Sequence, residues 1–347
     1  MSFDIAREAE TLAGYHRIGV VGLGQIGSSL AYGLRERCEV VGYDIEMQAR
    51  DEMARAGFAV VPSLEKLLGS VELCFFAIPA GALKAMLPKV FDLLVDSNVV
   101  IADLCSTKLD IEEALLALGI HAAGIRYVGL HPLAGNERQG SRGAELDLFR
   151  ERTMVVSSGI ASDAPSAVAV AALLVSAIGC RAIFVNPALH DRITNFTIQL
   201  PHIFAYLTSS FAKLVQDHTL LSLLSGNSFG DVTRVAKSSP EMVASFLFAN
   251  REILMQSLHQ LDAKLAALTD ALEEPNESSL VDLLRDYAPE GEEIYFETFV
   301  ESRILRSKVD FEDVIRALEE RRVLVESIHL EQNLLQVSGR QARRAED

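Results

Sequence analysis

A glycine-rich turn near the start of the chain constrains the fold more than any other feature of the sequence. The stretch RIGVVGLGQIGSSL, residues 17–30, predicts a strand, a tight turn and a helix. Its glycines Gly22, Gly24 and Gly27 are spaced as G-x-G-x-x-G. In this pattern the first glycine permits the turn, the second lets a pyrophosphate approach, and the third lets the helix pack on the strand. The stretch therefore predicts a dinucleotide-binding βαβ unit, and a purely structural glycine turn is the alternative.

A second apolar strand follows the helix and ends at Asp44. A carboxylate at this point accepts hydrogen bonds from the ribose hydroxyls of an adenosine and repels a 2′-phosphate. No arginine follows it until Arg50. The sequence therefore predicts NAD rather than NADP as the cofactor. Gln25 and Ile26 in the turn, and Pro79 at the end of a later strand, are further expected cofactor contacts.

Composition restricts the classes to which the chain can belong. Its 347 residues suffice for two domains, and 49% hydrophobic with 23% charged residues is ordinary for a globular protein. The net charge of −16 argues against a nucleic-acid partner, which requires a basic face. The acidic N-terminus lacks an apolar signal segment, and the longest apolar run, residues 167–178, is shorter than the ~20 residues that span a bilayer. We expect a cytoplasmic protein without a membrane segment.

The cysteines Cys38, Cys74, Cys105 and Cys180 are far apart and form no C-x-x-C pair. In a chain of this size they are expected to be reduced and mostly buried. We therefore expect no metal site.

Strand and helix patterns alternate along the first half of the chain. Apolar strands are predicted at residues 17–21, 39–44, 59–61, 71–77, 99–103, 126–130, 153–157 and 182–185. Helices are predicted between them at residues 47–56, 64–68, 83–95, 108–118 and 167–178. Because helices join parallel strands that are covered on both faces, this alternation predicts an α/β fold with a Rossmann-type doubly wound parallel sheet.

The pattern changes near Pro187, after which apolar-periodic helices are predicted at residues 190–217, 220–225 and 240–271. We therefore expect a dinucleotide-binding domain over residues 1–187 and an all-helical substrate and dimerisation domain over residues 188–275. Residues 276–347 form a charged C-terminal extension of unknown role, with a predicted helix at 311–321 and strands at 323–330. The aliphatic surface of the helical domain predicts a homodimer, and packing on the chain's own first domain is the alternative.

Polar clusters follow two of the predicted strands, at the edge of a parallel sheet where ligands bind. The first cluster, DLCSTK, begins at Asp103, and the second, HPLAGNE, begins at His131. Two further motifs lie in the helical region: QLPH begins at Gln199, and GDVTR begins at Gly230.

Together these motifs resemble those of the prephenate/arogenate dehydrogenase family of tyrosine biosynthesis. The resemblance covers residues 17–265 and rests on the dinucleotide turn, D-x-x-S-x-K from Asp103, H-P-x-A-G-x-E from His131, L-P-H ending at His202 and D-x-T-R ending at Arg234. Each motif is weak alone, but their order and spacing are specific. The resemblance implies an oxidative decarboxylation: a ring carbon gives its hydride to the nicotinamide, its hydroxyl becomes a carbonyl, and carbon dioxide leaves as the ring turns aromatic.

The resemblance also implies that His131 accepts the hydroxyl proton, for which the ordinary histidine pKa of about 6.5 is suitable. Ser106 would hydrogen-bond the same hydroxyl or the imidazole. The alternatives are a histidine that only caps a strand end and a helix cap at the start of the following helix, with Ser106 or Thr107 as the N-cap residue. Lys108 and Lys237 are candidates for anion contacts, but we expect them to be solvated surface lysines.

Arg234 is the expected anchor for a substrate carboxylate, because a guanidinium binds that group with two parallel hydrogen bonds. A surface salt bridge is the alternative role for this arginine. Asp231 and Glu137 are expected to hold the guanidinium or to gate access to the pocket. His202 and Gln199 complete the expected substrate contacts. Relatives often carry Ser-His where this chain has Ile-Gln at 198–199, so the family's substrate choice does not transfer directly.

These observations predict an NAD-dependent dehydrogenase that acts on a small molecule, prephenate. Arogenate or an amino-substituted prephenate is the alternative substrate. A β-hydroxyacid or imine-type reductase has the same two-domain layout but leaves the H-P-L-A-G segment unexplained. An NAD-sensing binding protein with a vestigial pocket is a further alternative, against which His131, Ser106 and Arg234 together argue.

Overall fold

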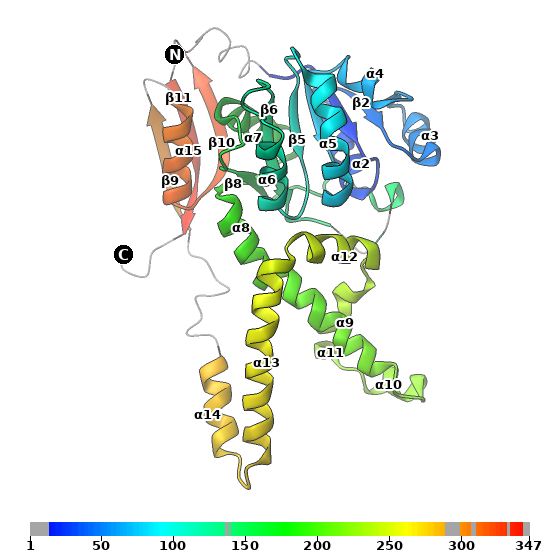
Figure 1. The fold of residues 1–347 in the computed structure, drawn as a ribbon, viewed down its shortest axis with the longest axis vertical. Helices are drawn as coiled ribbons and strands as arrows, with labels where there is room; N and C mark the ends of the chain where they lie inside the picture. Colours follow the sequence, from blue (N-terminus) through cyan, green and yellow to red (C-terminus); the bar gives the residue numbers. More distant parts are fainter. Residues whose placement is uncertain are drawn as a thin grey trace.

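The computed structural model of the protein describes residues 14–135, 138, 140–288, 299–306, 310–331 and 334–342. The described strands form one 11-stranded sheet, which lies in the upper part of Figure 1 with helices on both faces. A group of helices extends below the sheet. The predicted architecture, a doubly wound α/β domain followed by a helical domain, is confirmed.

Six parallel strands form the first part of the sheet, in the order β3-β2-β1-β4-β5-β6. This is the strand order of the doubly wound dinucleotide-binding fold. All residues of β4 and β5 are buried, which explains why these strands are apolar on both faces. The strands are β1 (Arg17–Val21), β2 (Glu39–Tyr43), β3 (Ala59–Val60), β4 (Leu73–Phe76), β5 (Val100–Asp103) and β6 (Arg126–Pro132).

Helices cover the two faces of this sheet and enclose two separate apolar cores. One core contains residues of α2 (Gln25–Leu34), α3 (Met47–Arg55) and α7 (Ala164–Ile178). The other contains residues of α4 (Leu64–Leu68), α5 (Ala80–Leu94) and α6 (Leu109–Ala117). The alanine-rich run is part of α7 and packs on the sheet, as predicted. The four cysteines are free and buried, which is also as predicted.

The sheet departs from the predicted parallel arrangement at β7 (Thr153–Ser157), which pairs antiparallel with β6. A short 3₁₀ turn, η1 (Ser141–Gly143), lies between these strands, and no crossover helix joins them among the described residues. A chain that returns without such a crossover pairs antiparallel. β8 (Arg181–Val185) then pairs parallel with β7, because α7 supplies the crossover.

The C-terminal extension continues the sheet rather than standing apart from it. Its elements are β9 (Phe299–Arg306), α15 (Phe311–Glu320), β10 (Val323–Glu331) and β11 (Leu334–Ala342), which continue the strand order as β8-β10-β11-β9. The Glu319 carboxylate accepts hydrogen bonds from the Ser158 hydroxyl and the Asn186 amide, which attaches α15 to the first domain. The helix and the strand at β10 were predicted, whereas β9, β11 and their attachment to the sheet were not.

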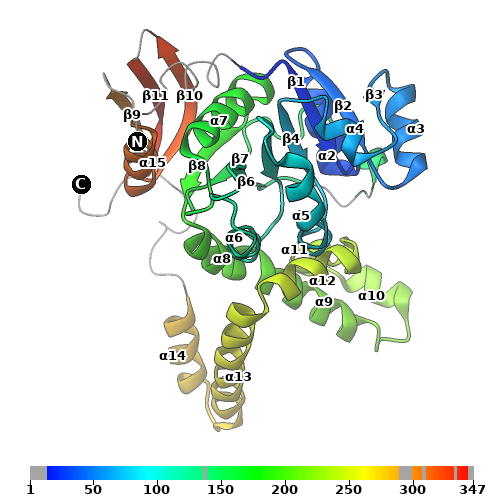
Figure 2. The ribbon, with the colours of Figure 1, turned by 45° about the horizontal axis from the view of Figure 1, so that its top comes forward.

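The helical domain consists of shorter pieces than the sequence predicts. A π-helix interrupts the first predicted helix, and Asn250 separates α12 from α13 within the last. The pieces are α8 (Pro187–Thr194), the π-helix η2 (Asn195–Gln199), α9 (Leu200–Ala212), α10 (His218–Leu224), α11 (Asn227–Thr233), the 3₁₀ turn η3 (Arg234–Lys237), α12 (Pro240–Ala249), α13 (Arg251–Glu273) and α14 (Ser278–Tyr287). In Figure 2 α13 and α14 project from the body of the molecule as a helical hairpin.

Large apolar side chains are exposed over the helical domain. Phe211, Leu223, Leu224 and Phe248 have exposed fractions between 68% and 77%. Exposed apolar surface of this kind marks interaction sites when it is contiguous. No helix among the described residues combines the length and apolar character that a bilayer crossing requires.

Candidate active site

The glycine-rich turn has the geometry that its sequence predicts. Gly22 follows β1 with φ +89°, in the left-handed region, and its amide donates to the Tyr43 carbonyl at 2.9 Å. A Cβ on Gly22 would lie 2.4 Å from the carbonyl oxygen of Ala77. A Cβ on Gly27 would lie 1.9 Å from the carbonyl oxygen of Gly22. Both positions therefore exclude a larger residue: at Gly22 the segment that follows β4 is too close, and at Gly27 the helix lies against the turn.

Gly24 differs from these two glycines because a Cβ on it would meet no atom within 4 Å. It is the N-cap of α2, which has no side-chain cap and no acidic residue in its first turn. The amides and positive end of α2 therefore fit a pyrophosphate that approaches through this space. Gln25 donates from its side-chain amide to the carbonyls of Arg138 and Gly143, and Ile26 packs on the core. Both residues thus have structural roles beside the expected cofactor contact.

Asp44 lies at the end of β2, beside the glycine turn. Its Oδ2 accepts the Leu23 amide at 2.6 Å, and its Oδ1 accepts the Glu46 amide at 2.8 Å. These bonds hold the carboxylate at the position where an adenosine ribose is expected. The Arg50 guanidinium donates to the backbone carbonyls of Asp44 and Ile45. Pro79, an expected cofactor contact, is exposed at the N-cap of α5, after β4.

We expect Gly24→Ala to raise the dissociation constant for NAD about ten-fold or more, a loss of about 1.4 kcal/mol. The added methyl group meets no protein atom, so the fold is unaffected, but it occupies the space through which a pyrophosphate would approach. Calorimetric titration with NAD and thermal unfolding measure the two effects. Gly27→Ala is the contrasting variant, and it should lower the unfolding temperature as well. An unchanged dissociation constant in Gly24→Ala would contradict this assignment.

His131 lies within β6, near its end, rather than after the strand as predicted. β6 continues beyond the last residue of β5, where Asp103 pairs with Gly129, and thereby carries His131 to the ligand-binding edge. The imidazole is 6% exposed, and its Nδ1 lies 2.9 Å from Nε2 of His190. Burial lowers the pKa of His131 well below its ordinary value, and the neighbouring His190 and Lys108 lower it further. The ring is therefore neutral near pH 7.

Lys108 is buried, so the prediction of a solvated surface lysine is wrong for this residue. It is 1% exposed, forms an ion pair with Asp103, and donates to the Leu130 carbonyl at 2.6 Å. The Tyr127 hydroxyl donates to the other oxygen of Asp103 at 2.5 Å. Burial, followed by the charge of Asp103, raises the pKa of Tyr127 well above its usual value, so the phenol stays protonated. By contrast, Lys237 is exposed as predicted.

Ser106 lies half-buried in the turn between β5 and α6. The N-cap position of α6 is Lys108, so the alternative interpretation of Ser106 as the cap of this helix is wrong. The amides of Lys108 and Leu109 instead donate to the carboxylate of Asp191, at 2.9–3.2 Å. Ser106 thereby lacks a capping role and stays a candidate for substrate contact.

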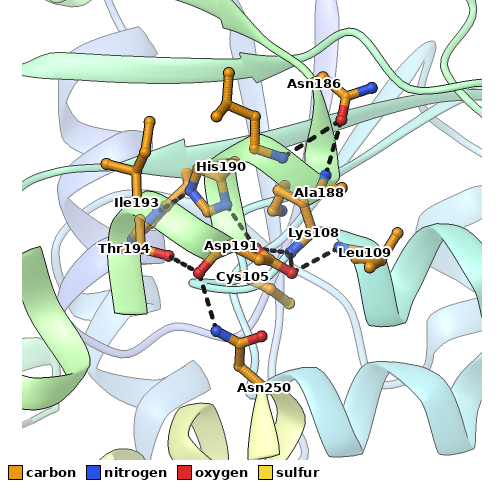
Figure 3. Close-up of polar contacts among 12 residues, drawn as sticks. Cys105, Lys108, Leu109, Asn186, Ala188, His190, Asp191, Ile193, Thr194 and Asn250 are labelled. Carbon is orange, nitrogen blue, oxygen red and sulfur yellow. Dashed lines mark hydrogen bonds and ion pairs between the residues drawn. The ribbon is translucent and has the colours of Figure 1, made fainter. Parts of the chain in front are cut away.

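His190 and Asp191 lie next to each other on α8 and were not predicted as site residues. Both are buried, and Nδ1 of His190 lies 2.6 Å from Oδ1 of Asp191 (Figure 3). Two ionisable residues among the apolar positions of a predicted helix, directly after the last strand of the first domain, are the signal that could have identified them. Together they connect α8 to the catalytic candidate on β6.

The expected substrate-binding residues on the π-helix and α9 already form hydrogen bonds with other groups of the protein. Gln199 is 1% exposed, and its Oε1 accepts from Nδ2 of Asn250 at 3.0 Å. Asn250 also donates to the Asp191 carbonyl, so Gln199 belongs to a buried polar network. His202 is half-buried, its Nδ1 donates to the Ile198 carbonyl at 2.8 Å, and its ring packs edge-on against Phe246. Its Nε2 is the nitrogen that remains for a ligand.

Arg234 begins the turn η3, directly after α11, and is exposed. Asp231, three residues earlier on α11, is exposed as well. Glu137, the third member of the expected network, lies outside the described residues. Among the described residues, the expected catalytic and substrate contacts thus come from two parts of the molecule: His131 and Ser106 from the edge of the sheet, and Gln199, His202, Asp231 and Arg234 from the helical elements below it (Figure 1).

Comparison with known proteins matches the two parts of the chain to one family. Residues 30–184 match the family model described as the nucleotide-binding domain of prephenate dehydrogenase. Residues 186–286 match the model described as the dimerization domain of prephenate dehydrogenase. The motifs from Asp103 to Arg234 lie within these two ranges, and the glycine-rich turn directly precedes the first of them.

Individual relatives agree with these matches. The prephenate dehydrogenase of Lactococcus lactis is 25% identical over 256 residues, which cover 72% of this chain and 69% of that protein. The cyclohexadienyl dehydrogenase of Zymomonas mobilis is 29% identical over 269 residues, which cover 74% and 89%. The crystal structure of Aquifex aeolicus prephenate dehydrogenase, in complex with hydroxyphenyl propionate and NAD⁺, has a TM-score of 0.66 at 22% identity and covers 78% of this chain and 96% of that chain.

Proposed function

The chain belongs to the prephenate dehydrogenase family, and we propose that it catalyses the NAD-dependent oxidative decarboxylation of prephenate to 4-hydroxyphenylpyruvate. The observation that carries this proposal is the placement of His131. Its imidazole is buried and neutral at the ligand-binding edge of the sheet, and His190 occupies Nδ1, so that Nε2 is left for the substrate. A neutral ring nitrogen in this position is suited to accept a hydroxyl proton.

The cofactor that we propose is NAD. The residues of the glycine turn fit it, because the position of Gly24 leaves room for a pyrophosphate and Asp44 follows β2. A carboxylate at this position repels the 2′-phosphate of NADP. The family model that matches residues 30–184, which include Asp44, describes a nucleotide-binding domain, and the Aquifex relative holds NAD⁺. Bound NAD would supply the hydride acceptor.

The proton in this reaction moves through His131. As the ring carbon of prephenate loses its hydride, the hydroxyl proton passes to Nε2 of His131 and the C–O bond becomes a carbonyl. The bond to the ring carboxylate then breaks, carbon dioxide leaves, and the electron pair enters the ring to form a phenolate. The phenolate takes the proton back from His131. Overall, prephenate and NAD⁺ are therefore converted to 4-hydroxyphenylpyruvate, carbon dioxide and NADH, with no net uptake or release of a proton.

Residues of both domains supply the remaining substrate contacts in this proposal. Arg234 binds a substrate carboxylate, because its guanidinium is exposed and matches that group in shape and charge. Asp231 and Glu137 orient the guanidinium, and Ser106 hydrogen-bonds the hydroxyl that reacts. His202 contacts the side-chain end of the substrate through Nε2, and Gln199 orients the pocket wall through Asn250.

Arogenate is a second candidate substrate, and the geometry of His202 favours it. A neutral ring that donates from Nδ1 to the Ile198 carbonyl presents Nε2 as an acceptor. An acceptor suits the side-chain ammonium of arogenate better than the ketone of prephenate. The name of the Zymomonas relative, cyclohexadienyl dehydrogenase, refers to the ring that both substrates share.

We also propose that the protein acts as a homodimer formed through the helical domain. The matching family model describes this part as a dimerization domain. The exposed apolar side chains of α9, α10 and α12 would be covered in such a dimer. Burial of apolar surface at about 25 cal/mol per Å² provides the driving force for this association.

The experiment that tests the proposed function follows NADH by its absorbance, with prephenate and with arogenate as separate substrates. We expect NADH formation that requires NAD and releases carbon dioxide in equal amount. Turnover of prephenate with a higher kcat/KM supports the proposal as stated, and a higher kcat/KM for arogenate reverses the substrate assignment. If neither substrate yields NADH, the proposed function is wrong.

The lowered pKa of His131 predicts how this activity depends on pH. His131 must be unprotonated to accept the hydroxyl proton, and its pKa lies well below the ordinary value of about 6.5. The base form therefore persists as the pH falls, so kcat/KM should stay constant below pH 6.5 and decline only at more acidic values. Initial rates between pH 5 and 8, corrected for the reaction without protein, measure this. A decline centred at or above pH 6.5 would contradict the prediction.

A further inference from the structure

The polar contacts of His131 continue beyond its own ring. Asp191, His190 and His131 form a continuous chain of hydrogen bonds, with 2.6 Å between Asp191 Oδ1 and His190 Nδ1 and 2.9 Å between His190 Nε2 and His131 Nδ1. All three side chains are at most 6% exposed. Resting on the proposed role of His131 as proton acceptor, we infer that His190 and Asp191 are positioning residues. They fix the His131 tautomer with a free Nε2 and hold the positive charge when the proton arrives.

The direction of each hydrogen bond follows from the carboxylate. An ionised Asp191 can only accept, so Nδ1 of His190 carries a hydrogen and donates. In a neutral His190, Nε2 is then unprotonated and accepts. Nδ1 of His131 must therefore donate to it, which leaves Nε2 of His131 with its lone pair. Asp191 thus determines the tautomer of His131 through His190, as a carboxylate orients the histidine in a catalytic triad.

Several hydrogen bonds hold Asp191 in place, so that it can set the directions of the hydrogen bonds in this chain. Its two carboxylate oxygens also accept the amides of Lys108 and Leu109 at the start of α6, at 2.9–3.2 Å. Its backbone carbonyl accepts from Asn250 at 3.0 Å, and Figure 3 shows it surrounded by these partners. The positive end of α6 stabilises a carboxylate at this position. Because both of its oxygens accept backbone amides, Asp191 acts as an acceptor toward His190 as well.

The charged groups around the two rings favour a cation on His190 over one on His131. Lys108 raises the cost of a positive charge on His131, whereas Asp191 contacts His190 directly. Lys108 is itself paired with Asp103 on β5. When Nε2 of His131 receives the hydroxyl proton, the hydrogen on its Nδ1 passes to Nε2 of His190. His131 is then neutral again, the charge lies beside Asp191, and the same path runs backward when the phenolate is protonated.

The three groups are arranged as a chain and not as a metal site. Among the described residues, no three His, Cys, Asp or Glu side chains converge on a point that a metal ion could occupy. The rings of His131 and His190 meet edge to face, with their centroids 5.1 Å apart, so that a nitrogen of each faces the other. This geometry is suited to proton transfer between the two rings and not to the binding of one ligand by both nitrogens.

A pair of substitutions at one position tests the inference. In His190→Gln the side-chain oxygen reaches the position of Nε2 and still accepts from His131, but the contact with Asp191 is lost. In His190→Asn the amide reaches the position of Nδ1, which retains the contact with Asp191 and loses the one with His131. We expect kcat to fall about ten-fold in the Gln variant and about 100-fold in the Asn variant, within the range that proton-transfer groups contribute. KM for NAD should change less than about two-fold in both.

If His190 had only a structural role, kcat would fall equally in both variants and in proportion to the fall in their unfolding temperatures. Equal kcat values in the two variants at matched unfolding temperature, or values within about three-fold of the unmodified protein, would therefore overturn the inference. Rescue of kcat in His190→Gln relative to His190→Asn supports it.

A second measurement does not depend on turnover. ¹⁵N NMR of protein labelled at histidine reports which ring nitrogens carry hydrogen in the absence of substrate. We expect His131 to carry hydrogen on Nδ1 only. In Asp191→Asn we expect a mixture of the two tautomers of His131. A hydrogen on Nε2 of His131 would overturn the inference. The expected tautomer combined with no NADH from either substrate would reject the proposed function and leave the positioning role supported.

Discussion

A His131→Asn variant is expected to lose about 10²–10⁴-fold in kcat with prephenate while its KM for NAD changes less than about two-fold. Asparagine has no group that accepts a proton near neutral pH, so the hydroxyl proton has no acceptor as the hydride leaves. The side-chain amide of the introduced asparagine reaches the position of Nδ1 and can still donate to His190. The buried hydrogen-bond chain is thereby preserved, and the loss reports the missing Nε2. Steady-state NADH formation measures kcat and both KM values.

His121→Asn is the matched control for this experiment, because His121 is exposed, follows α6 in the same domain and lies outside the hydrogen-bond chain. It should keep full activity. Thermal unfolding of His131→Asn should remain close to that of the unmodified protein. A kcat within about three-fold of the unmodified value would show that another group accepts the proton, and the mechanism proposed for His131 would be wrong.

The sequence was sufficient to predict the nucleotide-binding half of the fold. The spacing of Gly22, Gly24 and Gly27 is a local pattern, and it indicates the strand, turn and helix that surround it. The strands around them are apolar on both faces, and only a covered parallel sheet satisfies that pattern. Each of these constraints is contained within one segment of the chain.

The elements that were missed depend on contacts between distant segments. β9 and β11 are stabilised by pairing with each other, and the module to which they belong joins the sheet through β10 and β8. The break at Asn250 has a similar origin, since the side chain of Asn250 bonds to Asp191 and Gln199, which precede it by 59 and 51 residues. No periodicity within these segments encodes such partners.

The residues of the candidate site also divide into those that a local motif predicts and those that depend on contacts between distant segments. His131 was found because it belongs to a recognisable motif, whereas His190 and Asp191 become meaningful only when α8 packs beside β6 and α6. Lys108 was placed on the surface because isolated lysines are rarely buried. Its burial depends on Asp103, which lies five residues earlier, across the turn that joins β5 to α6. A charge is buried when a partner compensates it, and the partner is visible only in the folded chain.

Lys108→Met is expected to lower the free energy of unfolding by about 3–5 kcal/mol, the usual cost of breaking a buried ion pair by removing one partner. Methionine fills most of the volume but leaves the Asp103 carboxylate, which is 1% exposed, without its countercharge. Tyr127 and the Cys105 amide continue to donate to Asp103, and two neutral donors do not replace an ammonium. The Leu130 carbonyl also loses its donor, directly before His131, so kcat should fall as well.

Lys84→Met provides the comparison, because Lys84 forms an ion pair with Asp110 at a site where the lysine is 39% exposed. That pair should contribute only about 0–1 kcal/mol, since water screens both charges. Thermal and urea unfolding of the two variants measure the difference. The double variant Lys108→Met with Asp103→Asn should recover part of the stability, because it removes the unpaired charge as well as its partner. If Lys108→Met proved as stable as Lys84→Met, the ammonium of Lys108 would not be what compensates the buried Asp103 carboxylate, and this prediction would be wrong.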